Sequence, residues 1–65
     1  MRMYDIIMKK RKGYELSKEE IDFFVNGFTK GEIPDYQVSA LLMTLFFNEM
    51  SKSETANLTM SMVNS

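Results

Sequence analysis

The sequence predicts an all-α fold, a small four-helix bundle-like domain with short loops. Two observations predict it. Apolar residues recur at helical spacing along most of the chain, without the alternation typical of strands. Two capping boxes, in which a serine precedes a glutamate by three residues, mark helix starts at Ser17 and Ser51. At 65 residues the chain is a single domain, 1–65, with helices expected at about residues 3–12, 18–30, 35–49 and 52–63.

The first helix is expected to bury one apolar face and to end in a basic run. The stem of Lys10 shares that face with Met3, Ile6 and Ile7. The run 9–12 (KKRK) has two interpretations: a nuclear signal or phosphate-binding patch, or a helix end whose positive charge complements the helix dipole. The run is short and the net charge is −1, which favours the helix end.

The second helix begins at a capping box formed by Ser17 and Glu20, and Leu16 and Ile21 can form a hydrophobic staple across it. Its expected buried face consists of Ile21, Phe24, Val25 and Phe28. Gly27 is unfavourable inside a helix, so we expect a neighbouring helix to approach closely there.

The third helix lies in the most apolar stretch, Ile33–Met50, and has two apolar faces. Pro34 suits its first turn, and Asp35 can cap it or favour its dipole. One face, expected to pack on the other helices, carries Val38, Leu41, Leu42, Leu45 and Phe46. The opposite face carries Tyr36, Ala40, Met43, Phe47 and Met50.

We interpret Tyr36, Met43 and Phe47 as an outward face and predict that they form a dimer interface. The alternative is that both faces are covered within the four helices. A fourth helix should start at the second capping box, formed by Ser51 and Glu54. Ala56, Met60 and Val63 line one of its sides, and Thr55, Leu58 and Met62 line another.

Several kinds of chemistry find little support in the sequence. Without cysteine or histidine there can be no disulfide, thiolate metal site or imidazole catalysis. Glu19, Glu20 and Asp22 do not share one helix face, so they form a poor metal site and a good acidic helix start. We therefore expect no catalytic, metal or cofactor residue.

Nucleic acid and membrane are not expected partners either. The stretch Ile33–Met50 contains no Lys or Arg that could read a DNA groove. Thr44 and Asn48 interrupt it, which argues against a membrane span. A chain without cysteine is at home in the cytoplasm, where we expect this protein.

Several stretches along the whole chain, all in one register, point to one family. They are Met1-Arg2-Met3, Asp5-Ile6-Ile7 and Lys9-Lys10-Arg11, then Glu15-Leu16-Ser17, Glu19-Glu20-Ile21 and Phe23-Phe24, then Gly31–Gln37 and Ser39–Met43, and finally Leu58-Thr59-Met60 and Met62–Ser65. With these residues the chain resembles the start of bacterial pyrimidine-nucleoside phosphorylases. Thymidine phosphorylase is a close relative of that family, and anthranilate phosphoribosyltransferase has a looser version of the same helical domain.

The resemblance implies a parent enzyme much longer than this chain, with a helical domain and a large α/β domain. In such enzymes phosphate is a co-substrate in the reversible phosphorolysis of uridine, thymidine or deoxyuridine, which gives the base and a sugar 1-phosphate. The family's phosphate loop, of the type Lys-x-Ser-x-Gly-Gly-Val, lies beyond Ser65. The resemblance therefore assigns no catalytic residue here, and it implies a homodimer whose interface includes helices of this region.

Two hypotheses remain. The first is a scaffold and dimerisation segment of such an enzyme, inactive by itself, whose partners are a second copy and the remainder of the parent. This hypothesis agrees with the absence of a natural end signal at Asn64-Ser65. The second is an autonomous helical module that binds a protein partner and has no catalytic role.

Overall fold

The computed structural model describes residues 1–64, and these residues form helices and loops without a strand. The helices are α1 (Met3–Arg11), α2 (Lys18–Thr29), α3 (Asp35–Asn48) and α4 (Lys52–Asn64). The expected all-α fold is confirmed. Each observed helix ends within one residue of the position expected from the sequence.

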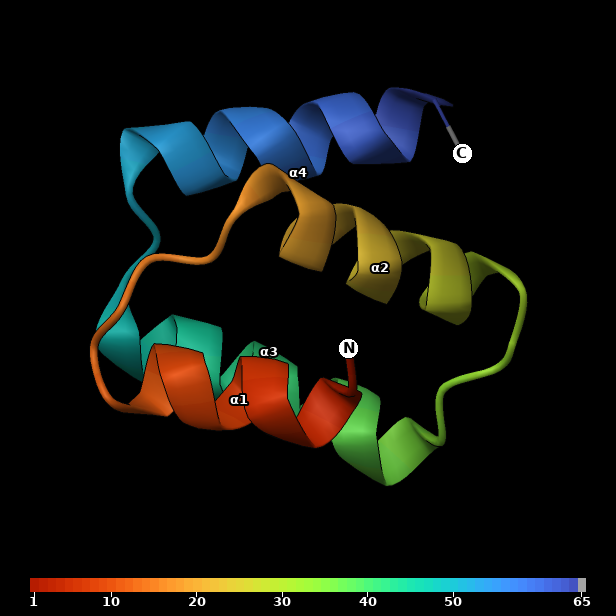
Figure 1. Ribbon diagram of the computed structural model, residues 1–65, viewed down its shortest axis with the longest axis horizontal. Coiled ribbons are helices and arrows are strands. Elements are labelled where there is room, and N and C mark those ends of the chain that lie inside the picture. Colours follow the sequence, from red (N-terminus) through yellow and green to blue (C-terminus); the bar gives the residue numbers. More distant parts are fainter. Residues whose placement is uncertain (65) are drawn as a thin grey trace.

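The helices are arranged as two packed pairs. α1 packs against α3, and α2 packs against α4. Figure 1 shows the α2 and α4 pair above the α1 and α3 pair, with loops connecting the two levels at both sides. Each of the connections α1–α2, α2–α3 and α3–α4 therefore crosses from one pair to the other.

The hydrophobic core lies between α1, α2 and α3. Ile6 and Leu41 are fully buried at its centre, at 0% and 1% exposure. The other buried core residues are Met3, Leu16, Ile21, Phe24 and Val25. Among the described residues of α4, only Leu58 is a partly buried apolar side chain packed against this core. The three other helices therefore hold the core together.

Both capping boxes predicted from the sequence are confirmed. In α2, Ser17 Oγ accepts a hydrogen bond from the Glu20 N–H at 3.1 Å, and Glu20 Oε1 accepts one from the Ser17 N–H at 2.8 Å. Ser51 and Glu54 repeat the arrangement in α4 at 3.1 and 2.8 Å. Each box supplies partners for N–H groups that a helix start leaves unpaired.

The structure corrects the expectation for Gly27 and decides between the two alternatives for Asp35. The close neighbour of Gly27 is the Ile33 side chain of the α2–α3 loop, which lies within 2.6 Å of the position that a Cβ would occupy. The neighbour is thus a loop side chain and not another helix. Asp35 makes no side-chain cap: Pro34 precedes the helix, and Asp35 is its first residue, where its charge favours the dipole.

Candidate functional site

The residues predicted to form the outward face of α3 are exposed. Tyr36, Met43 and Phe47 are 72%, 55% and 72% exposed. Their spacing of seven and four residues places them along one side of the helix. The structure therefore presents them together as an apolar row, which we call the α3 outer row. Phe47 also contacts Phe46 edge to face, with ring centroids 5.5 Å apart.

The opposite face of α3 is less covered than its apolar pattern predicts. Leu41 is buried and Val38 and Leu45 are half-buried, as a face packed on other helices should be. Leu42 and Phe46 are 53% and 77% exposed, so their expected packing on α1, α2 and α4 is wrong. The reason is geometric: α3 packs against α1, while α2 packs against α4.

An apolar groove of about 250 Å³ is lined by residues of α2, α3 and α4. We call it the apolar groove. Its lining consists of Phe24, Val25, Phe28, Thr29, Val38, Leu42, Leu58 and Met62. The half-exposed side chain of Leu42 lies in this lining, which accounts for part of its exposure. The groove and the α3 outer row are separate apolar features on different sides of α3, and exposed apolar surface of this kind marks interaction sites.

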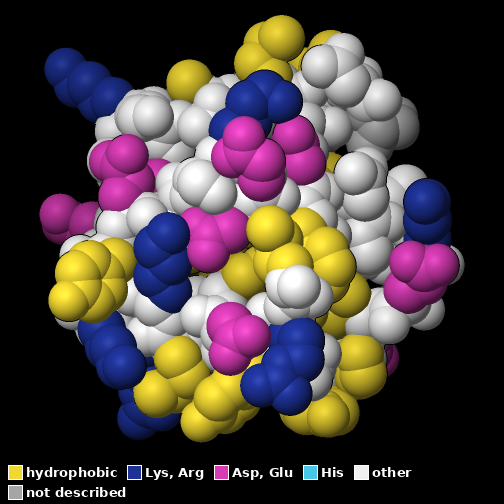
Figure 2. All heavy atoms as spheres, in the orientation of Figure 1, with side chains coloured by type: hydrophobic (Ala, Val, Ile, Leu, Met, Phe, Trp, Pro, Cys, Tyr) yellow, Lys and Arg dark blue, Asp and Glu magenta, His cyan; other side chains and the backbone are white. Residues whose placement is uncertain are grey.

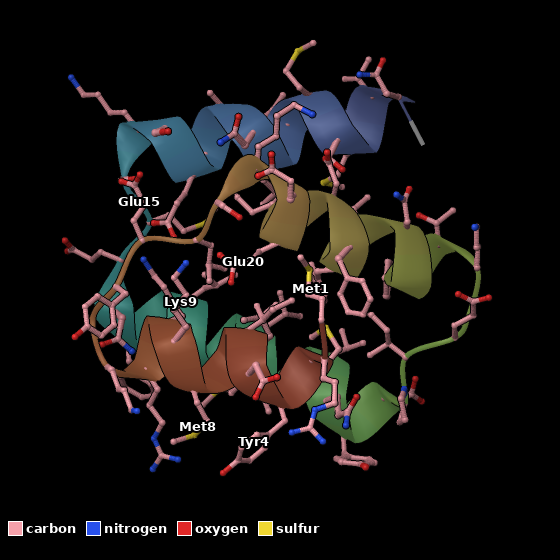
Figure 3. The ribbon with its side chains drawn as sticks, in the orientation of Figure 1. Met1, Tyr4, Met8, Lys9, Glu15 and Glu20 are labelled. Carbon is pink, nitrogen blue, oxygen red and sulfur yellow. The ribbon has the colours of Figure 1, made fainter. Side chains whose placement is uncertain are left out.

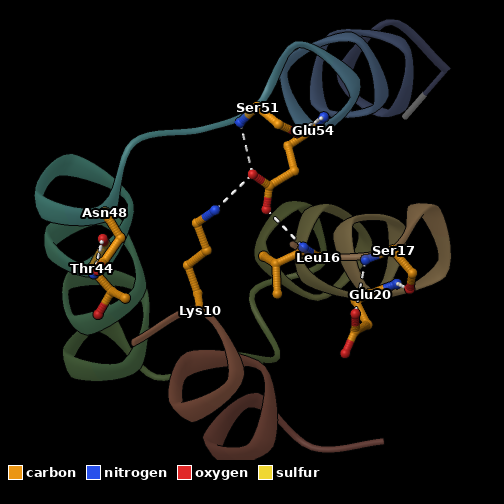
Figure 4. Close-up of polar contacts among 8 residues, drawn as sticks. All are labelled: Lys10, Leu16, Ser17, Glu20, Thr44, Asn48, Ser51 and Glu54. Carbon is orange, nitrogen blue, oxygen red and sulfur yellow. Dashed lines mark hydrogen bonds and ion pairs between the residues drawn. The ribbon is translucent and has the colours of Figure 1, made fainter. Parts of the chain in front are cut away.

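The most buried charged side chains in the described part of the chain form an ion pair between α1 and α4. Lys10 Nζ lies 2.6 Å from Glu54 Oε1, and the two side chains are only 5% and 1% exposed. Glu54 Oε2 accepts a further hydrogen bond from the Leu16 N–H at 2.7 Å. Figure 4 shows the carboxylate between the end of α1, the α1–α2 loop and its own cap at Ser51.

These contacts decide the charge state of Glu54. Burial by itself would raise the pKa of the carboxyl group. The hydrogen bonds from the Leu16 N–H, from Lys10 and from the Ser51 N–H outweigh burial and hold the pKa below its ordinary value. Glu54 is thus ionised at neutral pH and accepts three hydrogen bonds, and no buried side-chain nitrogen or oxygen within residues 1–64 lacks a partner.

Lys9 makes the matching contact with the other capping box. Its Nζ lies 2.7 Å from Glu20 Oε1, with side-chain exposures of 38% and 16%. Figure 3 shows Lys9 of α1 directed toward Glu20, while Tyr4 and Met8 point away from the molecule. Adjacent lysines at the end of α1 therefore each bind the first turn of a different helix, α2 or α4.

The role of these lysines was not predicted from the sequence, where the run 9–12 was interpreted as a charge-complemented helix end. A signal was available, because Lys10 lies seven residues after Met3 and four after Ile6, on the buried side of α1. A cation at such a position requires a buried anion. The other two residues of the basic run 9–12, Arg11 and Lys12, are exposed.

Figure 2 shows acidic and basic side chains interspersed across the face that it draws. Within residues 1–64 no group of three or more carboxylates is placed so that it could hold a metal ion. None of the helices in this same range is long and apolar enough to cross a membrane.

Comparison with known proteins gives the family. A family described as "Glycosyl transferase family, helical bundle domain" matches residues 4–65. Pyrimidine-nucleoside phosphorylases of Staphylococcus epidermidis and Bacillus subtilis are each 66% identical to this chain over its 65 residues, and that of Geobacillus stearothermophilus is 62% identical. The chain covers 15% of the length of these relatives and corresponds to their N-terminal helical domain.

Proposed function

Because the chain belongs to the helical bundle domain family of glycosyl transferases, we propose that it is the N-terminal scaffold and dimerisation segment of a pyrimidine-nucleoside phosphorylase. The observation that carries the proposal is 66% identity over the whole chain to two phosphorylases of that name. In this proposal the parent enzyme uses phosphate to split uridine, thymidine or deoxyuridine into the base and a sugar 1-phosphate. It acts in the cytoplasm.

The proposed role of these residues is structural. The buried ionisable side chains, Lys10 and Glu54, bind each other and are unsuited to move protons or to receive a substrate. Glu20 is engaged by its own cap and by Lys9. The groups that hold phosphate and nucleoside would then come from the remainder of the parent. This chain alone should show no phosphorolysis.

The test compares the 65-residue chain with the product of the full open reading frame that contains it. Each is incubated with uridine or thymidine, with and without phosphate, and release of the free base is measured. The proposal expects phosphate-dependent release from the long product and none above a buffer control from the short chain. Absence of release from a folded long product would contradict the parent's activity. Release by the pure short chain would contradict the scaffold role.

We propose that the α3 outer row is the surface through which two copies associate. Tyr36, Met43 and Phe47 supply exposed apolar area along one helix. A two-fold axis lets such a row pair with itself, and dimers of this type are the commonest oligomers. Methionine near the middle adapts to the opposing surface. This proposal is independent of the assay above, because it concerns association only.

The association test has a matched control in the molecule. Met43 on α3 and Met60 on α4 are both 55% exposed. A charge left unpaired in an interface is strongly destabilising, so Met43→Glu should weaken self-association at least about a hundredfold. Met60→Glu should leave it unchanged. Light scattering over a concentration series measures both, and circular dichroism checks that the variants stay helical. A native chain that is monomeric at all concentrations contradicts the proposal.

The apolar groove favours a second candidate, an autonomous module that binds a partner helix. Grooves of this kind accept the apolar face of an amphipathic helix. The two candidates make different predictions for the gene. A Gly-rich phosphate loop containing Lys and Ser, encoded within a few dozen codons after the codon for residue 65, identifies the enzyme. A stop codon at that point in the native gene identifies the module.

A further inference from the structure

The inward side of α4 is mostly polar. The side that faces α2 and the core carries four buried or half-buried residues at helical spacing: Glu54, Asn57, Leu58 and Ser61. Leu58 supplies the apolar contact with the core, and it is only partly buried. The centre of the core is formed instead by Ile6 of α1 and Leu41 of α3. Burial of apolar area therefore holds α4 less firmly than it holds the other helices.

The contact between α4 and α2 has a groove on each side. The apolar groove lies on one side. A polar groove of about 380 Å³ lies on the other, lined by Lys18, Asp22, Asn26, Asn57, Met60, Ser61 and Asn64. Hydrogen bonds from Lys18 of the same helix and from Ser61 of α4 lower the pKa of Asp22, so the Ser61 contact joins the two helices through polar groups on this side.

The strongest specific attachment of α4 is therefore at its first turn. Glu54 binds Lys10 of α1 and the backbone of Leu16 at 2.6 and 2.7 Å, and its side chain is 1% exposed. A hydrogen bond in which one partner is charged contributes more than a neutral one, and more when it is buried. Both of these contacts lie outside α4, so they tie it to the three-helix core.

We propose that α4 opens as a separate unit and that Glu54 is the latch that keeps it closed. When the contacts of Glu54 break, α4 leaves α2, while α1, α2 and α3 remain packed around Ile6 and Leu41. The matching segment of the phosphorylases is their N-terminal 15%, so in them the chain continues from the end of this helix. Opening of α4 would then change how the helical core is connected to the larger part of such an enzyme.

The first experiment uses the unmodified chain. Backbone amide hydrogen exchange is measured helix by helix, by NMR or by mass spectrometry of peptides, at several low denaturant concentrations. Amides in different units exchange through different opening reactions. The proposal expects amides of Lys52–Asn64 to exchange faster, and with a weaker dependence on denaturant, than those of Ile6 and Leu41. A single common opening for all four helices would overturn it.

The second experiment weakens the latch and has a control of the same kind. Glu54→Gln keeps the shape and a capping side chain but removes the charge that pairs with Lys10. Glu20→Gln makes the same change in the other capping box. Glu54→Gln should speed exchange in α4 by about tenfold to a hundredfold relative to α1–α3. Glu20→Gln should leave α4 at its original rate.

Two results of the second experiment overturn the proposal. One is unchanged exchange in α4 of Glu54→Gln. The other is equal acceleration in all four helices of a variant that remains folded. If Glu54→Gln does not fold, the denaturant series on the unmodified chain decides the question, because it needs no substitution.

Discussion

The first turns of α2 and α4 are built from the same parts in different surroundings. Each has a serine cap, a glutamate three residues later, and a lysine from the last turn of α1 on that glutamate. The Glu20 side chain is 16% exposed and its lysine is 38% exposed. For Glu54 and its lysine the values are 1% and 5%.

The difference shows how burial changes the role of a local motif. Around Glu20, water can replace a lost partner, so the ion pair adds little to a cap that is already complete. Around Glu54, no solvent is available, and the carboxylate needs all of its donors. The same residue types therefore cap a helix at Glu20, whereas at Glu54 they also join parts of the chain that are far apart in the sequence.

The largest difference in unfolding free energy is expected between variants that replace Lys10 or Lys9, one at a time. Lys10→Met leaves the Glu54 carboxylate buried without its counter-ion, which should cost about 3–5 kcal/mol of unfolding free energy. Lys9→Met breaks a partly exposed pair and should cost about 0.2–1 kcal/mol. Urea unfolding at pH 7, followed by circular dichroism, measures both. Equal losses would mean that the two pairs do not differ in the way their burial indicates.

The second prediction concerns how acid lowers the free energy of unfolding through Glu20 and Glu54. For Glu20, burial raises the pKa, but hydrogen bonds from Lys9 and Ser17 outweigh it, so the pKa is lowered, as it is for Glu54. A carboxyl group with a lowered folded-state pKa stabilises the fold above its unfolded-state pKa. That contribution disappears as the pH falls through the folded-state value. Stability should therefore be constant above about pH 5 and fall below it, by at most about 1.4 kcal/mol per pH unit for each group.

The pH series should assign more of this loss to Glu54. Urea midpoints between pH 7 and pH 3 are compared for the native chain, Glu54→Gln and Glu20→Gln. Each substitution removes one titrating group, so each should flatten the acid limb, and Glu54→Gln should flatten it more. Identical acid limbs in all three proteins would place the source of acid sensitivity in other carboxylates.

The smallest difference in stability between the two helix starts is expected when the capping serines are replaced. Ser17→Ala and Ser51→Ala each remove one acceptor from a helix start and should each cost about 0.5–2 kcal/mol. Glu54 keeps Lys10 and Leu16 when Ser51 is lost, so the effect on α4 should stay within that range. Urea midpoints measure the change. If neither substitution moves the midpoint, groups other than these caps hold the helix starts.

These cases also separate what the sequence can predict from what it cannot. The capping boxes were predictable because Ser17 and Glu20, like Ser51 and Glu54, are three residues apart and meet in any helix. The contact between Lys10 and Glu54 joins residues 44 positions apart, and it depends on how helix pairs stack. Local spacing indicates that Lys10 is buried, but it does not name the partner.

The third helix illustrates the same limit. Its pattern correctly indicated two apolar faces, and Leu41 is buried as expected. Helical spacing cannot tell whether a face meets a neighbouring helix or the edge of a groove. Leu42 and Phe46 were therefore assigned to packed positions, although both are largely exposed. Gly27 was likewise recognised as a close contact, but its neighbour, Ile33, lies in a loop.

The donors around Glu54 also restrict how this pair can change during evolution. Two of its hydrogen bonds come from the backbone N–H groups of Leu16 and Ser51, which no substitution can convert into acceptors. A charge swap, with Glu at position 10 and Lys at position 54, would place an ammonium group against those N–H groups. We therefore expect an acceptor side chain at position 54 in homologous sequences, and we expect donors other than lysine to be tolerated at position 10. The residue at position 10 can therefore change while Glu54 is kept, but a change of position 54 to a donor should not be found, whatever residue is at position 10.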